Sequence, residues 1–135
     1  TLHGLEHQTG EVPAFEVVVA SDGSTDGTAQ SLREYQKTAS FPVRVIEQEN
    51  AGPSCARNRG IAEATGTIIV FLDDDVEPEP PFLASHAAHH RRDPQIAVIG
   101  PMNRAADRVG QEPVWIAWEH RMLAEQYHNF LTGVW

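Results

Sequence analysis

The 135-residue sequence has little positive charge, a single cysteine and no long apolar run. Lys37 is the only lysine and the formal net charge is −9, which argues against non-specific binding to nucleic acid. Because Cys55 has no second cysteine to pair with, no internal disulfide can form, as is usual in a reducing compartment. No stretch approaches the roughly 20 apolar residues of a membrane span. To bind a negatively charged ligand, the protein would need a local source of positive charge or hydrogen-bond donors, such as a metal, an arginine or backbone amides.

What is present fits one globular α/β domain. The chain is 41% hydrophobic and 21% charged, and its length suits a single core. Runs rich in β-branched residues predict strands at 15–20, 41–48, 67–72 and 95–100. Helical spacing predicts helices over 1–8, 82–92 and 115–130. Two further helices are predicted: one begins after Ser24 or Thr25, either of which can be its N-cap, and the other begins after residue 54 and ends with Gly66 as its C-cap. The alternation of helices and strands predicts a mainly parallel sheet flanked by helices, and 101–113 reads as a polar loop.

The stretch from Thr67 to Glu77 is the most informative part of the chain. Six residues that favour strands, Thr67 to Leu72, run directly into Asp73, Asp74 and Asp75. In open α/β sheets, ligands bind in the crevice beyond the carboxyl ends of the strands. Three adjacent carboxylates repel one another, and a divalent cation with oxygen ligands would compensate their charge. A solvated acidic turn is the simpler alternative.

A second acidic loop, Asp22 to Gly27, follows the strand predicted at 15–20. It superficially matches the start of a calcium-binding EF-hand loop, but the twelfth position is Arg33 rather than glutamate, so the calcium interpretation is rejected. No GxGxxG spacing supports a dinucleotide site. A phosphoacceptor receiver site fits poorly because the only lysine, Lys37, does not lie on a later strand. Asp22 then remains either a turn former or a ligand contact beside a helix N-terminus.

Three segments resemble family 2 glycosyltransferases in sequence, order and spacing. They are EVVVASDGSTDGT (16–28), ENAGPSCARNRGIAEATG (49–66) and IIVFLDDDVEP (68–78). The resemblance covers about residues 1–100 and implies the GT-A fold, a Rossmann-like nucleotide-binding α/β sandwich. It departs from the usual pattern at Ser21, where such enzymes carry a second acid before Asp22.

The resemblance also implies roles for individual residues. It assigns Asp22 to the nucleobase, Asp75 to a Mn²⁺ or Mg²⁺ ion, and Asp73 or Asp74 to the ribose and to metal-bound water, with Asp73 a further candidate for the metal. Arg57 is a candidate partner of the nucleotide or its diphosphate, or else an exposed helix arginine. The catalytic residue is unknown.

Other chemically notable side chains have simpler interpretations. His86, His89 and His90 have spacings that could bind zinc, but a solvated helix face explains them better. Cys55 is expected to be a buried helix residue, since no base accompanies it. The aromatic residues of the last helix are expected to contribute to the core, with stacking on a sugar as a minor alternative: Trp115, Trp118, Tyr127 and Phe130.

The predicted function is transfer of a sugar from a nucleotide-diphosphate sugar, expected to be UDP-linked, with metal dependence and inversion. The acceptor, whether glycan, lipid or small molecule, is not indicated, and no nucleic-acid partner is expected. The alternative is a non-catalytic nucleotide- or metal-binding remnant. A cytoplasmic location is expected, with peripheral association at the inner face of the membrane left open.

The resemblance also sets expectations about the extent of the domain. Residues 1–100 are expected to form the donor-binding region and 101–135 the start of an acceptor-side region. The sheet is expected to lack its first strand, which would lie between 15–20 and 67–72, and the acceptor-side part with its catalytic carboxylate is also expected to be missing.

Overall fold

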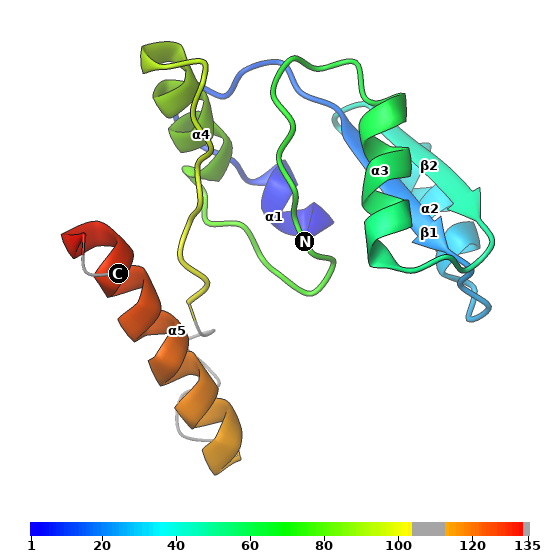
Figure 1. The fold of residues 1–135 in the computed structure, drawn as a ribbon. Coiled ribbons are helices and arrows are strands. Elements are labelled where there is room, and N and C mark those ends of the chain that lie inside the picture. Colours follow the sequence, from blue (N-terminus) through cyan, green and yellow to red (C-terminus); the bar gives the residue numbers. More distant parts are fainter. Residues whose placement is uncertain (104–112, 134–135) are drawn as a thin grey trace. The chain divides into compact units, whose positions relative to one another are not determined.

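A computed structural model of the chain describes residues 1–103 and 113–133. It divides into two units, 1–96 and 97–135, which are described separately. The first unit contains six regular elements (Figure 1): α1 (Leu2–Glu6), β1 (Val17–Asp22), α2 (Thr28–Gln36), β2 (Val43–Gln48), α3 (Pro53–Glu63) and α4 (Phe82–Arg92). The second contains α5 (Val114–Thr132). The mixed α/β class predicted from the sequence is confirmed.

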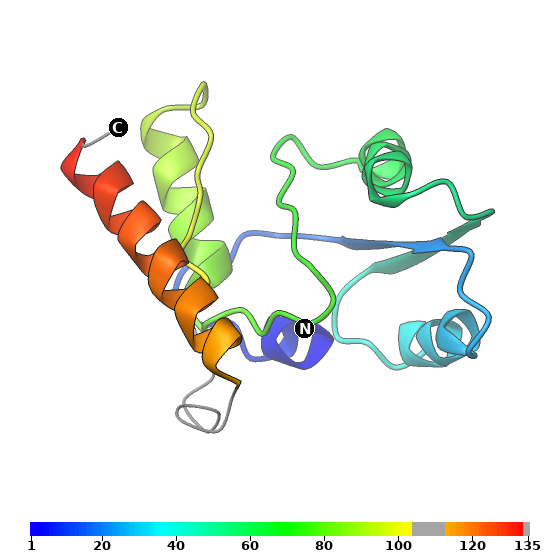
Figure 2. The same cartoon turned by 60° about the horizontal axis from the view of Figure 1, so that its bottom comes forward.

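The sheet of the first unit consists of two parallel strands in the part of the chain that the structure describes. β1 and β2 pair from Val17 with Val43 to Asp22 with Gln48, so both strands end at the same edge. Parallel neighbours need a crossover, which α2 supplies. Seen edge-on in Figure 2, the sheet has α3 on one face, against β1, and α2 on the other, against β2. Cover on both faces explains why β1 is a continuous valine run rather than an alternating pattern.

The start of α2 differs from the sequence prediction. Gly27 occupies the N-cap with a φ of +89°, and neither Ser24 nor Thr25 caps the helix, so that prediction was wrong. The side chain of Asp26, the residue before the N-cap, provides the hydrogen bonds instead. Its Oδ1 accepts from the Thr28 backbone N–H at 3.0 Å and from the Thr28 hydroxyl at 2.6 Å. These bonds satisfy a donor of the first helical turn that would otherwise lack a partner. Ala29, Leu32 and Tyr35 are half-buried, as expected of the inner face.

The end of α3 also differs from the prediction. The C-cap is Ala64, in an extended conformation, rather than Gly66. The helix ends there because Glu16, just before β1, accepts hydrogen bonds from the backbone N–H of Thr65 at 2.6 Å and from its hydroxyl. The start of β1 is thereby tied to the end of α3. Ile61, in the second half of α3, is 44% exposed.

Two of the predicted strands are wrong. Residues 67–72 and 95–100 form no strand in the structure, and Ile69, Phe71 and Ile99 are exposed. A strand needs the backbone of a neighbouring strand for its hydrogen bonds. Among the described residues β1 and β2 pair only with each other, and neither apolar run pairs with either of them.

α1 is held against the turn that follows the acid cluster. Leu5 is 7% exposed, and a Cβ placed on Gly4 would lie 2.8 Å from the Cδ of Pro78, so only glycine fits there. Gln8 adds polar contacts, because its Nε2 donates to the carbonyl oxygen of Glu79 at 2.9 Å and its Oε1 accepts from the backbone N–H of Leu83 at 2.8 Å. These contacts fix both ends of the segment 78–83.

The second unit consists of α5 and the residues around it. The helix has no buried residue, and Trp115, Trp118 and Phe130 are 65%, 61% and 45% exposed, so the expectation that they form core was wrong. α5 is the sole regular element among the described residues of this unit, so the unit itself offers no second regular element for it to pack against. Of the predicted loop 101–113, residues 104–112 lie outside the described residues. None of the described helices has the length and apolar character needed to cross a membrane.

Candidate nucleotide-sugar site

Asp22 ends β1 and joins that strand to the loop before α3. Its Oδ1 accepts hydrogen bonds from Nε2 of Gln48 at 2.8 Å and from the backbone N–H of Ala51 at 2.8 Å. Its Oδ2 accepts a third from the backbone N–H of Gly52 at 2.9 Å. The hydrogen bond from Ala51 has the largest effect in lowering the pKa of Asp22, followed by those from Gln48 and Gly52. The side chain is therefore held as a carboxylate at the carboxyl edge of the sheet.

The same two loops also meet through their backbones. Gly23 has a φ of +76°, and a Cβ at this position would lie 2.9 Å from the backbone N of Asn50. The Nδ2 of Asn50 donates to the backbone carbonyl of Asp22 at 3.3 Å. The DGS segment (22–24) and the ENAG segment (49–52) therefore form one joined structure, although Asp22 and Asn50 are 28 positions apart in the sequence.

The acid cluster Asp73–Asp75 forms an exposed turn. The backbone N–H of Val76 donates to the carbonyl oxygen of Asp73 at 3.3 Å. The hydroxyl of Thr1, at the N-cap of α1, lies 2.5 Å from the carbonyl oxygen of Val76 and 2.7 Å from that of Asp74. These contacts use backbone carbonyls and not the carboxylates, and all three acidic residues are exposed.

Arg57 connects the acid turn to α3. Its Nη2 lies 3.0 Å from Oδ1 of Asp73, and the two side chains are 50% and 57% exposed. Arg57 belongs to the first half of α3, which begins at Pro53, directly after the amides that bind Asp22. The first half of α3 thus contacts both acidic segments, Asp22 through the loop at its start and Asp73 through Arg57. Cys55, expected to be buried, is exposed on the same helix.

The remaining carboxylates suit a hard divalent cation. Asp74 and Asp75 make no side-chain hydrogen bond or ion pair with the residues described. The acids of this turn do not converge into a closed cage, since the structure gathers no three of them around one point among the described residues. Mg²⁺ commonly binds through one or two carboxylates together with substrate phosphates and water, so an open pair of oxygen donors fits such an ion.

The histidines of α4 do not form a metal site. Among the described residues, these histidines belong to no group of three or more side chains close enough together to bind one metal ion. His86 lies against Phe82, with ring centroids 4.7 Å apart, and burial lowers the pKa of His86, with smaller contributions from His90 and His89.

Sequence reasoning missed the partners of Asp22. Gln48 could have been found from the parallel register, which pairs it with Asp22 at the strand ends. The amides of Ala51 and Gly52 have no side-chain signal and depend on the loop conformation. The hydroxyl of Thr1 beneath the acid turn was likewise not foreseen.

Fold and site together form a parallel α/β unit whose two acidic segments both contact α3 or the loop before it. In open α/β sheets, ligands bind beyond the carboxyl ends of the strands, where Asp22 lies. The chain matches Glycosyl transferase family 2 over residues 1–133, and it belongs to that family.

Similar curated proteins are also glycosyltransferases. The chain is 44% identical over 68 residues to the uncharacterized glycosyltransferase YibD of Escherichia coli, covering 50% of this chain and 19% of that protein. It is 35% identical over 82 residues to glycosyltransferase AglE of Haloferax volcanii, covering 61% and 27%. It is 34% identical over 103 residues to hyaluronan synthase of Pasteurella multocida, covering 75% and 10%. The chain thus spans at most 27% of the length of these three relatives. No solved structure gives a significant match.

Proposed function

We propose that this chain forms the donor-binding part of a glycosyltransferase that takes a nucleotide-diphosphate sugar, UDP-linked, and transfers the sugar with inversion. The observation that carries the proposal is the position of α3: the loop directly before it binds Asp22, and Arg57 in its first half contacts the acid turn. We also propose a GT-A-like arrangement around this core. Membership of glycosyl transferase family 2 supports a nucleotide-sugar donor.

The Asp22 carboxylate can take one more hydrogen bond. An ionised carboxylate offers about four acceptor positions. Gln48 and Ala51 occupy Oδ1, and Gly52 occupies one position on Oδ2. The remaining position suits an N–H donor such as the imide of a uracil ring, and the fixed carboxylate requires no reorientation to accept it. This network supports the proposed role of Asp22, because the carboxylate is already oriented before a nucleobase would bind.

Arg57 and the acid turn would receive the rest of the donor. The guanidinium of Arg57 can exchange its exposed contact with Asp73 for the diphosphate, which offers two or more charged oxygens in place of one. Asp75 would hold a Mg²⁺ or Mn²⁺ ion, with Asp73 sharing it, and Asp74 or Asp73 would contact the ribose and metal-bound water. When bound, the ion supplies positive charge to the diphosphate as the leaving group becomes more negative.

The acceptor and the residue that deprotonates it are not assigned. Inversion requires a base that takes the proton of the acceptor hydroxyl while its oxygen attacks the anomeric carbon in line. None of the described residues is placed to do so by the contacts around Asp22 and the acid turn.

The proposal is tested by titrating the protein with UDP, GDP, dTDP and ADP in the presence of Mg²⁺ and by assaying turnover of the corresponding nucleotide sugars. UDP is expected to bind most tightly, and release of UDP from a UDP-sugar is expected with or without added acceptor. Binding without any turnover would leave a nucleotide-binding remnant. Failure of every nucleotide to bind would overturn the proposal.

A further inference from the structure

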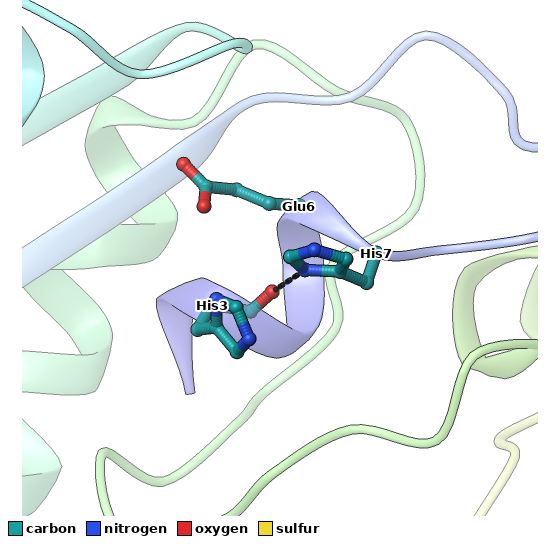
Figure 3. Close-up of side chains that lie close together, drawn as sticks. All are labelled: His3, Glu6 and His7. Atoms are coloured by element: carbon teal, nitrogen blue, oxygen red, sulfur yellow. Dashed lines mark hydrogen bonds between the residues drawn. The ribbon is translucent and has the colours of Figure 1, made fainter.

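Three side chains on α1 form a group that the donor site does not use. His3 and Glu6 belong to this helix and His7 is its C-cap residue (Figure 3), and one ligand atom from each lies within 4.8 Å of the others. It is the one such group within residues 1–103 and 113–133. We propose that His3, Glu6 and His7 bind a borderline divalent metal, zinc above all, at a site distinct from the acid turn.

The helix presents these residues on one side because the opposite side is packed. Positions i, i+3 and i+4 are neighbours on a helical surface. Leu5 is buried and Gly4 lies against Pro78, so the helix cannot rotate without losing those contacts. All three candidate ligands are exposed, as a site open to metal in solution requires.

Two of the three ligands already have hydrogen bonds that orient them. Nδ1 of His7 lies 2.8 Å from the carbonyl oxygen of His3. A carbonyl only accepts, so this nitrogen carries the hydrogen and leaves Nε2 free to bind a metal. Oε1 of Glu6 accepts a hydrogen bond from the hydroxyl of Tyr35 at 2.7 Å, which leaves Oε2 free. Tyr35 itself lies near the ring of Phe41, with centroids 6.5 Å apart. Outer hydrogen bonds of this kind orient the ligands in natural metal sites.

The donor set discriminates between metals. Two imidazoles and one carboxylate are a frequent zinc ligand set, and they leave a further position for water. Mg²⁺ and Mn²⁺ prefer oxygen ligands, so they would favour the acid turn instead. The rings of His3 and His7 are 4.2 Å apart between centroids, close enough for small side-chain rotations to bring their nitrogens onto one ion.

A metal at this position would also affect the donor site through α1. The hydroxyl of Thr1, the N-cap of α1, contacts the backbone of the acid turn. An ion that joins His3 to His7 fixes one turn of the helix and thereby steadies the acid turn next to it. The zinc site itself does not depend on the proposed transferase function.

The experiment titrates the protein with ZnCl₂ in excess MgCl₂, by calorimetry and by competition with a chromogenic chelator, and repeats the titration with Co²⁺ to record its visible spectrum. One Zn²⁺ per chain is expected, with the cobalt bands of a nitrogen- and oxygen-ligated ion of low coordination number. His3→Ala and His7→Ala should each lower the affinity by more than about tenfold, and Tyr35→Phe by about tenfold. Glu6→Gln, which keeps an acceptor for Tyr35, tests the carboxylate separately.

The matched control is His89→Ala/His90→Ala on α4, which should bind Zn²⁺ as the unsubstituted protein does. Loss of binding in this control, or unchanged affinity in His7→Ala, would overturn the proposal. Because the candidate ligands are exposed, the metal-free variants should melt as the unsubstituted protein does, and Zn²⁺ should raise the melting temperature of the unsubstituted protein but not of His7→Ala. UDP binding in Mg²⁺ should persist in His7→Ala, so failure of the zinc site and failure of the donor site are distinguishable.

Discussion

Replacing Gly23 with alanine tests whether the two loops of the donor site can meet only at a residue without a side chain. The φ angle is +76°, and the added Cβ would lie 2.9 Å from the backbone N and 3.0 Å from the Cβ of Asn50. A positive φ costs alanine about 1–2 kcal/mol, and the lower entropy of the unfolded chain offsets about 0.4–1 kcal/mol of that. Displacing the backbone of Asn50 adds about 1–3 kcal/mol, the usual cost of overpacking. We therefore expect the free energy of unfolding to fall by about 1–5 kcal/mol.

Gly27→Ala is the matched control for this substitution. Gly27 has a φ of +89°, but a Cβ there would meet nothing within 4 Å. It should therefore show the backbone cost alone, at most about 1.6 kcal/mol. Urea unfolding of both variants separates the cost of the positive φ angle from the cost of displacing the backbone of Asn50. UDP affinity should fall more in Gly23→Ala, because that substitution displaces the hydrogen-bond partners of Asp22. Equal destabilisation by the two variants, or an unaltered Gly23→Ala, would refute the close approach of the loops.

Three further predictions concern the contacts around the site. The hydrogen bond from Ala51 is the main cause of the lowered pKa of Asp22. The stabilisation that this carboxylate contributes is therefore fully present at a pH above 3.8, the ordinary pKa of the side chain. It is lost as the pH falls through the lowered pKa of the folded protein. Asp22→Asn should melt below the unsubstituted protein at pH 7, and the gap should narrow below pH 3.8; a constant gap would contradict the assigned bonds. Gly4→Ala, whose methyl would lie 2.8 Å from a packed proline ring carbon, should destabilise the protein, whereas Gly60→Ala, with nothing within 4 Å, should stabilise it by about 0.5–1 kcal/mol; the reverse order in urea unfolding would show that α1 is not packed as described. Arg57→Gln should change the unfolding free energy by no more than about 1 kcal/mol, because its ion pair is exposed, yet weaken UDP binding most at low salt; an unaltered affinity would remove the arginine from the site.

The elements that the sequence predicted correctly are those whose signal is local. The valine run of β1 and the segment of β2 form strands, and α3, α4 and α5 form where apolar spacing indicated helices. Residues 67–72 carry an equally strong local signal but form no strand. Strand formation also requires pairing with a neighbouring backbone, and these residues pair with none among those described. The C-terminal end of α3 was mispredicted for a similar reason, since Glu16, distant in sequence, binds Thr65.

The residues of the candidate site were likewise predicted only in part. That Asp22 would end a strand could be predicted from its position, whereas its three hydrogen-bond partners depend on the parallel register and on a loop conformation. The contact between Arg57 and Asp73 joins residues 16 positions apart, and helical spacing does not determine it. His3 and His7 show the spacing of a metal-binding pair, but the contribution of Tyr35 through Glu6 could be seen only in the structure.

We propose above that the acid turn binds the donor through a divalent ion held by Asp75. Calorimetric titration with UDP, with Mn²⁺ present and with the metal removed by a chelator, tests it most directly in three proteins: unsubstituted, Asp75→Asn and the control Asp93→Asn, which alters an exposed acid after α4. We expect UDP to bind more tightly with Mn²⁺ in the unsubstituted and control proteins, and this metal dependence to vanish in Asp75→Asn. UDP binding that keeps the same affinity and the same dependence on Mn²⁺ in Asp75→Asn would contradict the account.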